Sequence, residues 1–240
     1  MIRPEGCDFP SPHYSMTHYL YLHGFGSGPK SQKAQRMNLR FQNLGLHLEI
    51  PDLNQEDFSH LTLSRQIGQV SDQVLAWSDP VVIIGSSLGG LTAAWVAQQP
   101  RVQGRIAQLV LLAPAFDFLT QWLPRLGSAQ MDRWRTTGYL AVYHYDAQQT
   151  LPLHYNFWLD GETYCDRNLR AVVPTLILHG LQDEVISIEA SRTYAATRPW
   201  VNLVELWDDH SLLGTEELIW QHTWTFLAQP KPNVAELRNF

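Results

Sequence analysis

The sequence predicts an α/β fold in which helices cover both faces of a mostly parallel central sheet. Three observations predict it. Apolar runs rich in β-branched residues recur along the chain, as in Val81–Ile84, and are typical of buried parallel strands. Segments with helical spacing of apolar residues follow most of these runs. A chain of 240 residues with 45% hydrophobic and 17% charged residues also has the size and composition of one folded α/β domain.

Up to residue 115 the sequence predicts strands and helices in alternation. The predicted strands are apolar runs, at Tyr19–Leu22, His47–Ile50, Val81–Ile84 and Ala107–Leu112. The predicted helices have Ala34, Met37, Phe41 and Leu44 on one face before Gly45, then Ile67, Val70 and Val74 in a stripe, then Leu91–Ala97 before Pro100.

The alternation resumes after residue 172. The predicted elements are a strand at Pro174–Leu178, a helix from its N-cap Ser187 to Ala196, a strand at Asn202–Leu206 and a helix that begins near Thr215. Residues 17–228 are therefore expected to form a single domain. Residues 1–16 contain three prolines and no periodicity, so we expect a flexible N-terminal arm there and a C-terminal tail at residues 229–240.

Residues 116–165 interrupt this alternation. Eleven of the chain's aromatic residues (nine each of Trp, Tyr and Phe) lie in this segment. An insert of this length with surplus apolar surface indicates either a cap over a pocket or a segment with its own small core, and both can hold.

The motif Gly85-Ser86-Ser87-Leu88-Gly89 stands between a predicted buried strand and a predicted helix. In that setting Gly-x-Ser-x-Gly places a serine on a sharp, strained turn at the carboxyl end of a central strand. Alignment on the two outer glycines makes Ser87, and not Ser86, the candidate nucleophile. The same motif also occurs in plain turns. Catalytic partner residues elsewhere in the chain must therefore decide between the two interpretations.

The glycine-rich loop His23–Ser31 has two functional interpretations besides a plain strand-to-helix connection. One is a phosphate-binding loop that uses Lys30, but Pro29 replaces the required second glycine and has no N–H to offer a phosphate. The other is an oxyanion loop that presents the Phe25 N–H to a developing negative charge. The downstream Gly-x-Ser-x-Gly motif favours the oxyanion loop.

A serine hydroxyl needs a base to take its proton, usually a histidine that a carboxylate orients. Ser87, Asp183 and His210 each follow a predicted strand, at the sheet edge where α/β folds gather catalytic groups. Their chain order is that of a hydrolase triad on an α/β sheet. Asp183 could alternatively be only a turn residue, and Asp208 and Asp209 neighbour His210 in sequence.

Two stretches resemble a known family. The stretch Leu20–Ser31 (LYLHGFGSGPKS) and the later Gly85–Gly90 (GSSLGG) are similar to the YqiA/YcfP-like esterase family of the α/β-hydrolase superfamily. The resemblance covers residues 18–115 well and residues 172–227 more loosely. The aromatic insert departs from the compact members of that family, so the resemblance does not extend to substrate preference.

The resemblance implies an α/β-hydrolase fold and hydrolysis of carboxylic esters or thioesters. It implies Ser87 as nucleophile, Asp183 as acid and His210 as base. The backbone N–H groups of Phe25 and Leu88 would form the oxyanion hole.

The sequence therefore predicts a serine hydrolase that works through an acyl-enzyme intermediate on a small-molecule acyl ester or thioester. A peptidase or an acyltransferase would use the same triad. A catalytically silent binding module of this fold would be expected to lack a triad or oxyanion position, and none is missing. As a hypothesis, the aromatic insert forms an apolar acyl pocket that favours medium-length acyl chains.

Charge and motif content argue against several other classes. The net charge of −6 and the absence of a Lys/Arg stripe do not indicate a nucleic-acid partner. No apolar run approaches a membrane span, and the N-terminus lacks the apolar core of a signal peptide, so a cytoplasmic location is expected. No metal-binding or Rossmann motif is present, so neither a metal nor a redox cofactor is expected. The oligomeric state is not readable from the sequence.

Overall fold

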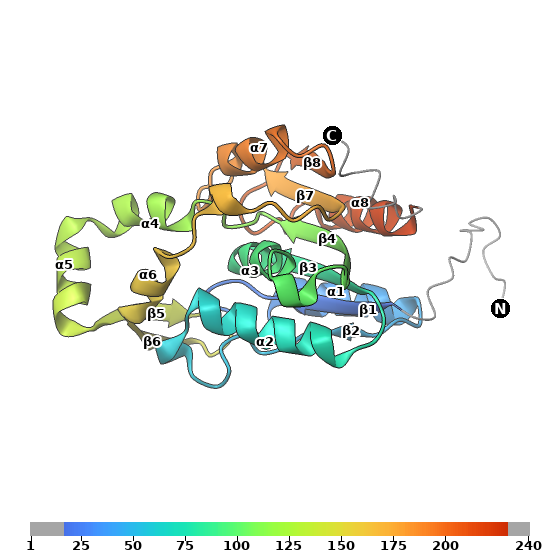
Figure 1. Cartoon of the computed structure of the whole chain (residues 1–240). Helices are drawn as coiled ribbons and strands as arrows, with labels where there is room; N and C mark the ends of the chain where they lie inside the picture. Colours follow the sequence, from blue (N-terminus) through green and yellow to red (C-terminus); the bar gives the residue numbers. More distant parts are fainter. Residues whose placement is uncertain (1–16, 230–240) are drawn as a thin grey trace.

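The computed structural model describes residues 17–229, and within them a six-stranded sheet is the centre of the molecule (Figure 1). The strand order is β2-β1-β3-β4-β7-β8, and every neighbouring pair is parallel. The strands are β1 (His18–Leu22), β2 (Leu48–Glu49), β3 (Val81–Ser86), β4 (Ile106–Leu112), β7 (Thr175–Gly180) and β8 (Val201–Leu206). The predicted parallel sheet is confirmed. The predicted arm at residues 1–16 and the predicted tail beyond Gln229 lie outside the described residues.

Helices cover both faces of the sheet because successive strand residues point to opposite sides. On one face α1 (Gln32–Asn43) and α8 (Glu216–Ala228) pack against alternate residues such as Tyr19 and Tyr21. On the other face α2 (Leu63–Ala76), α3 (Leu88–Ala97) and α7 (Ile188–Ala196) pack against Leu20, Leu22 and their neighbours. Short 3₁₀ turns lie at Phe58–His60, Pro100–Val102 and Asp166–Asn168.

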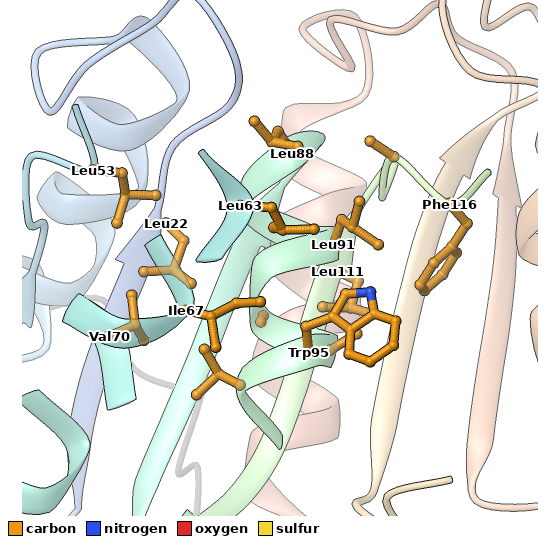
Figure 2. Close-up of a cluster of buried hydrophobic side chains, with 14 of the residues drawn as sticks. Leu22, Leu53, Leu63, Ile67, Val70, Leu88, Leu91, Trp95, Leu111 and Phe116 are labelled. Carbon is orange, nitrogen blue, oxygen red and sulfur yellow. The ribbon is translucent and has the colours of Figure 1, made fainter. Parts of the chain in front are cut away.

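The central helix α3 is buried on all sides, which explains why its sequence is apolar without a polar stripe. Figure 2 shows Leu91 and Trp95 of this helix lying between Ile67 of α2 and Phe116, in front of the sheet. The helix begins at Leu88, three residues before the predicted start, because its N-cap is Ser87 of the Gly-x-Ser-x-Gly motif itself.

Two other sequence expectations need correction. Leu44 was expected on the buried face of the first helix, but it follows the last helical residue and is 47% exposed. The chain turns away there, since Gly45 adopts a φ of 72° and its N–H bonds to the Gln42 carbonyl. The second strand is only two residues long, because no further residue of the predicted run pairs with β1.

The aromatic insert extends from one end of the sheet, as α4 (Phe118–Leu126), α5 (Ser128–Thr137), the antiparallel hairpin β5 (Tyr139–His144) and β6 (Gln149–His154), and α6 (Asn156–Gly161) (Figure 1). Trp134 of α5 is 1% exposed, and its indole N–H donates to the Leu153 carbonyl at 2.9 Å. Its ring makes edge contacts with Trp122, Tyr155 and Trp158. The insert thus packs an aromatic core, which is continuous with the core under the sheet.

No helix among residues 17–229 is both long and apolar enough to cross a membrane.

Candidate active site

Ser87 occupies a strained turn between β3 and α3. Its backbone has φ 52° and ψ −118°, a conformation that non-glycine residues rarely adopt. The flanking glycines allow the turn, because a Cβ on Gly85 would lie 2.4 Å from the Gly89 carbonyl oxygen. A Cβ on Gly89 would lie 2.2 Å from the Leu22 carbonyl oxygen of β1. The motif therefore brings the serine hydroxyl to the carboxyl end of the sheet with backbone packed on both sides.

The two serines of the motif have different environments. Ser86 is 3% exposed and hydrogen-bonds to the Tyr21 hydroxyl. Burial raises the pKa of Tyr21 well above its ordinary value, so this phenol stays neutral. Ser87 is partly exposed, and its Oγ lies 3.1 Å from Nε2 of His210. Only the second serine thus has a base beside it.

His210 and Asp183 complete a hydrogen-bonded chain with Ser87. The Nδ1 of His210 donates to Oδ2 of Asp183 at 2.7 Å. Asp183 also accepts the N–H groups of Val185 and Ile186, at 2.8 and 2.7 Å. Burial alone would raise the pKa of the Asp183 carboxyl, but hydrogen bonds from His179 and His210 outweigh it and hold the pKa well below its usual range.

The loops after β7 and β8 lie against each other because Gly180 has no side chain. A Cβ there would lie 2.4 Å from the Asp208 carbonyl oxygen. Asp208 and Asp209 do not reach the imidazole. Asp208 accepts from the N–H and hydroxyl of Thr215, and Asp209 accepts from Ser211, so both carboxylates organise the loop that holds His210.

His179 is a second imidazole on the same carboxylate, and the sequence analysis gave it no role. Its Nε2 lies 3.1 Å from Oδ2 of Asp183 and 3.0 Å from the Ile186 carbonyl. Both partners are acceptors, so Nε2 holds a proton, and Nδ1 pairs with the Ser191 hydroxyl at 2.7 Å. The only available signal was its position at the end of a strand, four residues before Asp183.

The glycine-rich loop after β1 passes directly beside the nucleophile. A Cβ on Gly24 would lie 3.3 Å from the Ser87 Cβ. Buried His23 accepts the Leu53 N–H at its Nε2, so its Nδ1 donates to the Gly24 carbonyl, 3.0 Å away. That carbonyl belongs to the same peptide group as the Phe25 N–H, which therefore points the opposite way. Within residues 17–229, the N–H groups of Phe25 and Leu88 donate to no other group.

Two cavities lie near this constellation. The serine cavity, of about 270 Å³, is bordered by Ser87, His210, Phe25 and Lys33, together with Tyr21, Gly24, Ser27, Ser31, Gln32, Ser86, Tyr145, Ser211 and Leu213. The insert cavity, of about 580 Å³, has an apolar wall that includes Leu88, Leu91, Phe118, Phe157 and Trp158. The two cavities share no bordering residue. The Phe25 ring borders the first and packs on Phe118 and Phe157 of the second.

The described part of the chain contains no group of three or more His, Cys, Asp or Glu side chains arranged to hold a metal ion. At the candidate site a hydroxyl, an imidazole and a carboxylate lie in line.

Comparison with known protein families identifies the family of this chain. The sequence profile of the Uncharacterised protein family (UPF0227) matches residues 18–227. The chain belongs to this family. The match confirms the YqiA-like resemblance of the two motifs, and it extends over the insert, which the resemblance left out.

Solved structures show that the UPF0227 chain has the α/β-hydrolase fold. Alpha/beta hydrolase domain-containing protein 10 from mouse has a TM-score of 0.71 and 19% identity, over 88% of this chain and 89% of that one. Est1E from Butyrivibrio proteoclasticus, with ferulic acid bound, has a TM-score of 0.67 and 20% identity, over 91% and 92%. A monoacylglycerol lipase from Paleococcus ferrophilus has a TM-score of 0.66 and 16% identity, over 92% and 97%. No curated protein matches the chain.

Proposed function

We propose that this protein is a serine hydrolase that cleaves small carboxylic esters or thioesters. The observation that supports it most is the continuous hydrogen-bonded chain from Ser87 through His210 to Asp183, beside two backbone N–H groups that have no partner among residues 17–229. A nucleophile, a base, an orienting acid and oxyanion donors in one place are the groups that acyl transfer requires.

In the proposed mechanism, Nε2 of His210 takes the Ser87 proton as Oγ attacks the acyl carbonyl. Asp183 is ionised and stabilises the imidazolium that forms. The N–H groups of Phe25 and Leu88 hold the oxyanion, at about 2.7–4 kcal/mol per donor in comparable sites. His210 then protonates the leaving group, and an acyl-enzyme remains. Water that His210 activates attacks the acyl-enzyme and releases the acid.

The size of the serine cavity favours compact substrates. Its volume of about 270 Å³ must hold both the ester and part of each substituent. The insert cavity has the apolar wall expected of an acyl pocket, but neither Ser87 nor His210 borders it. Short acyl groups are therefore proposed in place of the medium-length chains of the sequence hypothesis. Two structural neighbours, Est1E and the monoacylglycerol lipase, have names that indicate ester chemistry, which agrees with the proposal.

The test is hydrolysis of nitrophenyl esters from acetyl to palmitoyl, with acyl thioesters in parallel. Ser87→Ala should lower kcat by several orders of magnitude, because the triad acts as a unit. The matched control is Ser86→Ala, one residue away, which removes a hydroxyl bonded to Tyr21 and should keep most of the activity. Wild-type activity no higher than that of Ser87→Ala on every ester and thioester would reject the proposal and favour a silent binding module.

A further inference from the structure

Lys33 borders the serine cavity from the first turn of α1. Within residues 17–229 its ammonium group makes no hydrogen bond and no ion pair. Burial lowers the pKa of Lys33 to about 8, while the nearby carboxylates of Asp183, Asp209 and Asp208 raise it. An ammonium group without a partner in a largely buried position is costly, so its position calls for an anion that residues 17–229 do not supply.

The carboxylates around Lys33 already accept hydrogen bonds from other groups. Asp183 accepts from two imidazoles and two backbone N–H groups. Asp208 and Asp209 accept from Thr215 and Ser211 in their own loop. These three carboxylates lower the cost of burying the positive charge of Lys33 from a distance, but none of them accepts a hydrogen bond from its ammonium group. The donors of Lys33 are therefore free for a molecule in the cavity.

The start of α1 adds further donors to the same wall. Ser31, the N-cap residue, and Gln32, the first helical residue, both border the cavity. Ser31 makes no side-chain cap hydrogen bond, and the N–H groups of Gln32 and Lys33 have no partner within the described residues. The positive end of the helix dipole and these N–H groups favour an anion at this point.

We propose that Lys33 and the first turn of α1 form an anion subsite of the serine cavity, so that the substrate ester carries a carboxylate or phosphate group close to its scissile bond. This inference rests on the proposed function and names the substrate class. Both groups accept several charge-assisted hydrogen bonds, which is the chemistry that an ammonium and a helix N-terminus supply together. The small cavity volume requires the anionic group and the ester to be a few bonds apart.

The subsite is not the phosphate loop considered from the sequence. That motif would use Lys30, which is exposed and does not border the cavity. Lys33, three positions later and in the first turn of α1, is the lysine that borders the serine cavity. Lys30 is therefore a matched control, because it has the same charge in the same segment and no access to the cavity.

The activity arm compares monomethyl succinate with methyl butyrate, which has a similar chain and no charge. Methanol release would be followed by NMR. The wild type should prefer the charged ester, and Lys33→Met should lower the ratio of the two kcat/KM values about tenfold to a hundredfold, the usual weight of one charge-assisted hydrogen bond. Lys33→Arg should restore part of the ratio, and Lys30→Met should leave it unchanged. A ratio that Lys33→Met does not move argues against a carboxylate at the subsite.

The binding arm needs no hydrolysis. Titration calorimetry of Ser87→Ala with succinate and with inorganic phosphate should show binding of at least one anion, and Ser87→Ala/Lys33→Met should lose it. Phosphate binding without succinate binding supports the subsite and identifies the anion as phosphate. Anion binding by a wild type that hydrolyses neither esters nor thioesters upholds the subsite and rejects the hydrolase. Ester hydrolysis with no charge preference and no anion binding overturns the subsite and keeps the hydrolase.

Discussion

The two cavities on either side of Phe25 differ in chemistry, size and origin. The serine cavity is small, and its border comes mostly from loops at the carboxyl ends of sheet strands and from the start of α1. The insert cavity is larger, and most of its border comes from the segment between β4 and β7. The Phe25 ring borders the first cavity and contacts Phe118 and Phe157 of the second, and the Phe25 N–H is one of the two proposed oxyanion donors.

The difference teaches that an aromatic-rich insert is not in itself a substrate pocket. Trp134, Phe157 and Trp158 are buried against one another and against the domain core, where they stabilise the fold. From the hairpin, Tyr145 alone borders the serine cavity; it is 72% exposed, and its N–H donates to the Gly26 carbonyl at 2.7 Å. The insert therefore meets the proposed site through its contact with the proposed oxyanion loop.

The largest effect is expected on the serine side, at Asp183. Asp183→Asn keeps the size of the side chain but no longer holds His210 in the tautomer that can take the Ser87 proton. We expect kcat to fall about 10⁴-fold, as for the equivalent change in other triads. The measurement is steady-state hydrolysis of nitrophenyl acetate.

The matched control for Asp183 is Asp209→Asn, the carboxylate adjacent to His210 in sequence. Asp209 bonds only within its own loop, so kcat should fall less than about tenfold. Equal losses in the two variants would mean that the carboxylates act only through the loop, and the assignment of Asp183 would fail.

The next effect is expected on the insert side and concerns stability. Trp134→Ala removes a buried indole with three aromatic neighbours and should lower the free energy of unfolding by about 3–5 kcal/mol. Trp134→Phe keeps most of the packing but removes the indole hydrogen bond to the Leu153 carbonyl, at a cost of about 0.5–1.5 kcal/mol. Urea denaturation measures both. A loss below about 1 kcal/mol for Trp134→Ala would show that the insert is not part of the cooperative core.

The sequence predicts the serine side far better than the insert side, for a physical reason. Parallel strands bring their carboxyl ends to one edge, so Ser87, Asp183 and His210 could be placed together from strand order alone. The structure brings these three into hydrogen-bond contact. The sequence also predicts the α1 helix, from the apolar residues on one of its faces. Lys33 lies among the polar residues of that helix, and no sequence pattern distinguishes it from exposed Lys30.

The insert could not be predicted beyond its limits and composition. Its strands pair with each other, and its aromatic rings contact Phe25, which is far away in sequence. The periodicity of a sequence does not encode such contacts. His179 illustrates the same limit within the site. Its position at the end of β7 was visible, but its hydrogen bond to Asp183 depends on a turn that brings residues 179 and 183 together.

A smaller effect should follow when the boundary between the cavities is removed. Phe25→Ala deletes the separating ring and leaves the backbone N–H in place, so the serine cavity should open into the insert cavity. Each methylene that becomes buried adds about 0.8 kcal/mol, so burial of about two or three more methylenes should raise the kcat/KM ratio of octanoyl to acetyl nitrophenyl esters about tenfold to a hundredfold.

Phe118→Ala is the control for the boundary. Phe118 lies on the insert side of Phe25, so this variant enlarges the insert cavity without connecting it to Ser87. Its chain-length profile should stay that of the wild type. A shift in Phe118→Ala equal to that in Phe25→Ala would mean that the two cavities already communicate and that Phe25 does not separate them.

The smallest expected effect is a pH dependence of substrate preference. A lysine is charged below its pKa, and burial lowers that of Lys33 to about 8, so the preference for monomethyl succinate over methyl butyrate should be full near pH 7 and fade by about tenfold toward pH 9.5. The groups around Lys33 are Asp183, Asp208, Asp209, His210, Tyr21 and Tyr145, and, in a neighbouring cavity that Lys33 also borders, Arg36, Arg40 and Glu216. The pKa values of Asp183 and Asp209 lie below their ordinary values and that of Tyr21 lies above, so these three do not titrate in this window. Because methyl butyrate passes through the same proposed triad, the ratio removes any pH dependence that the two esters share. In Lys33→Arg the charge persists to higher pH, so the ratio should stay flat there, and a wild-type ratio that is equally flat would show that the Lys33 charge does not select the substrate.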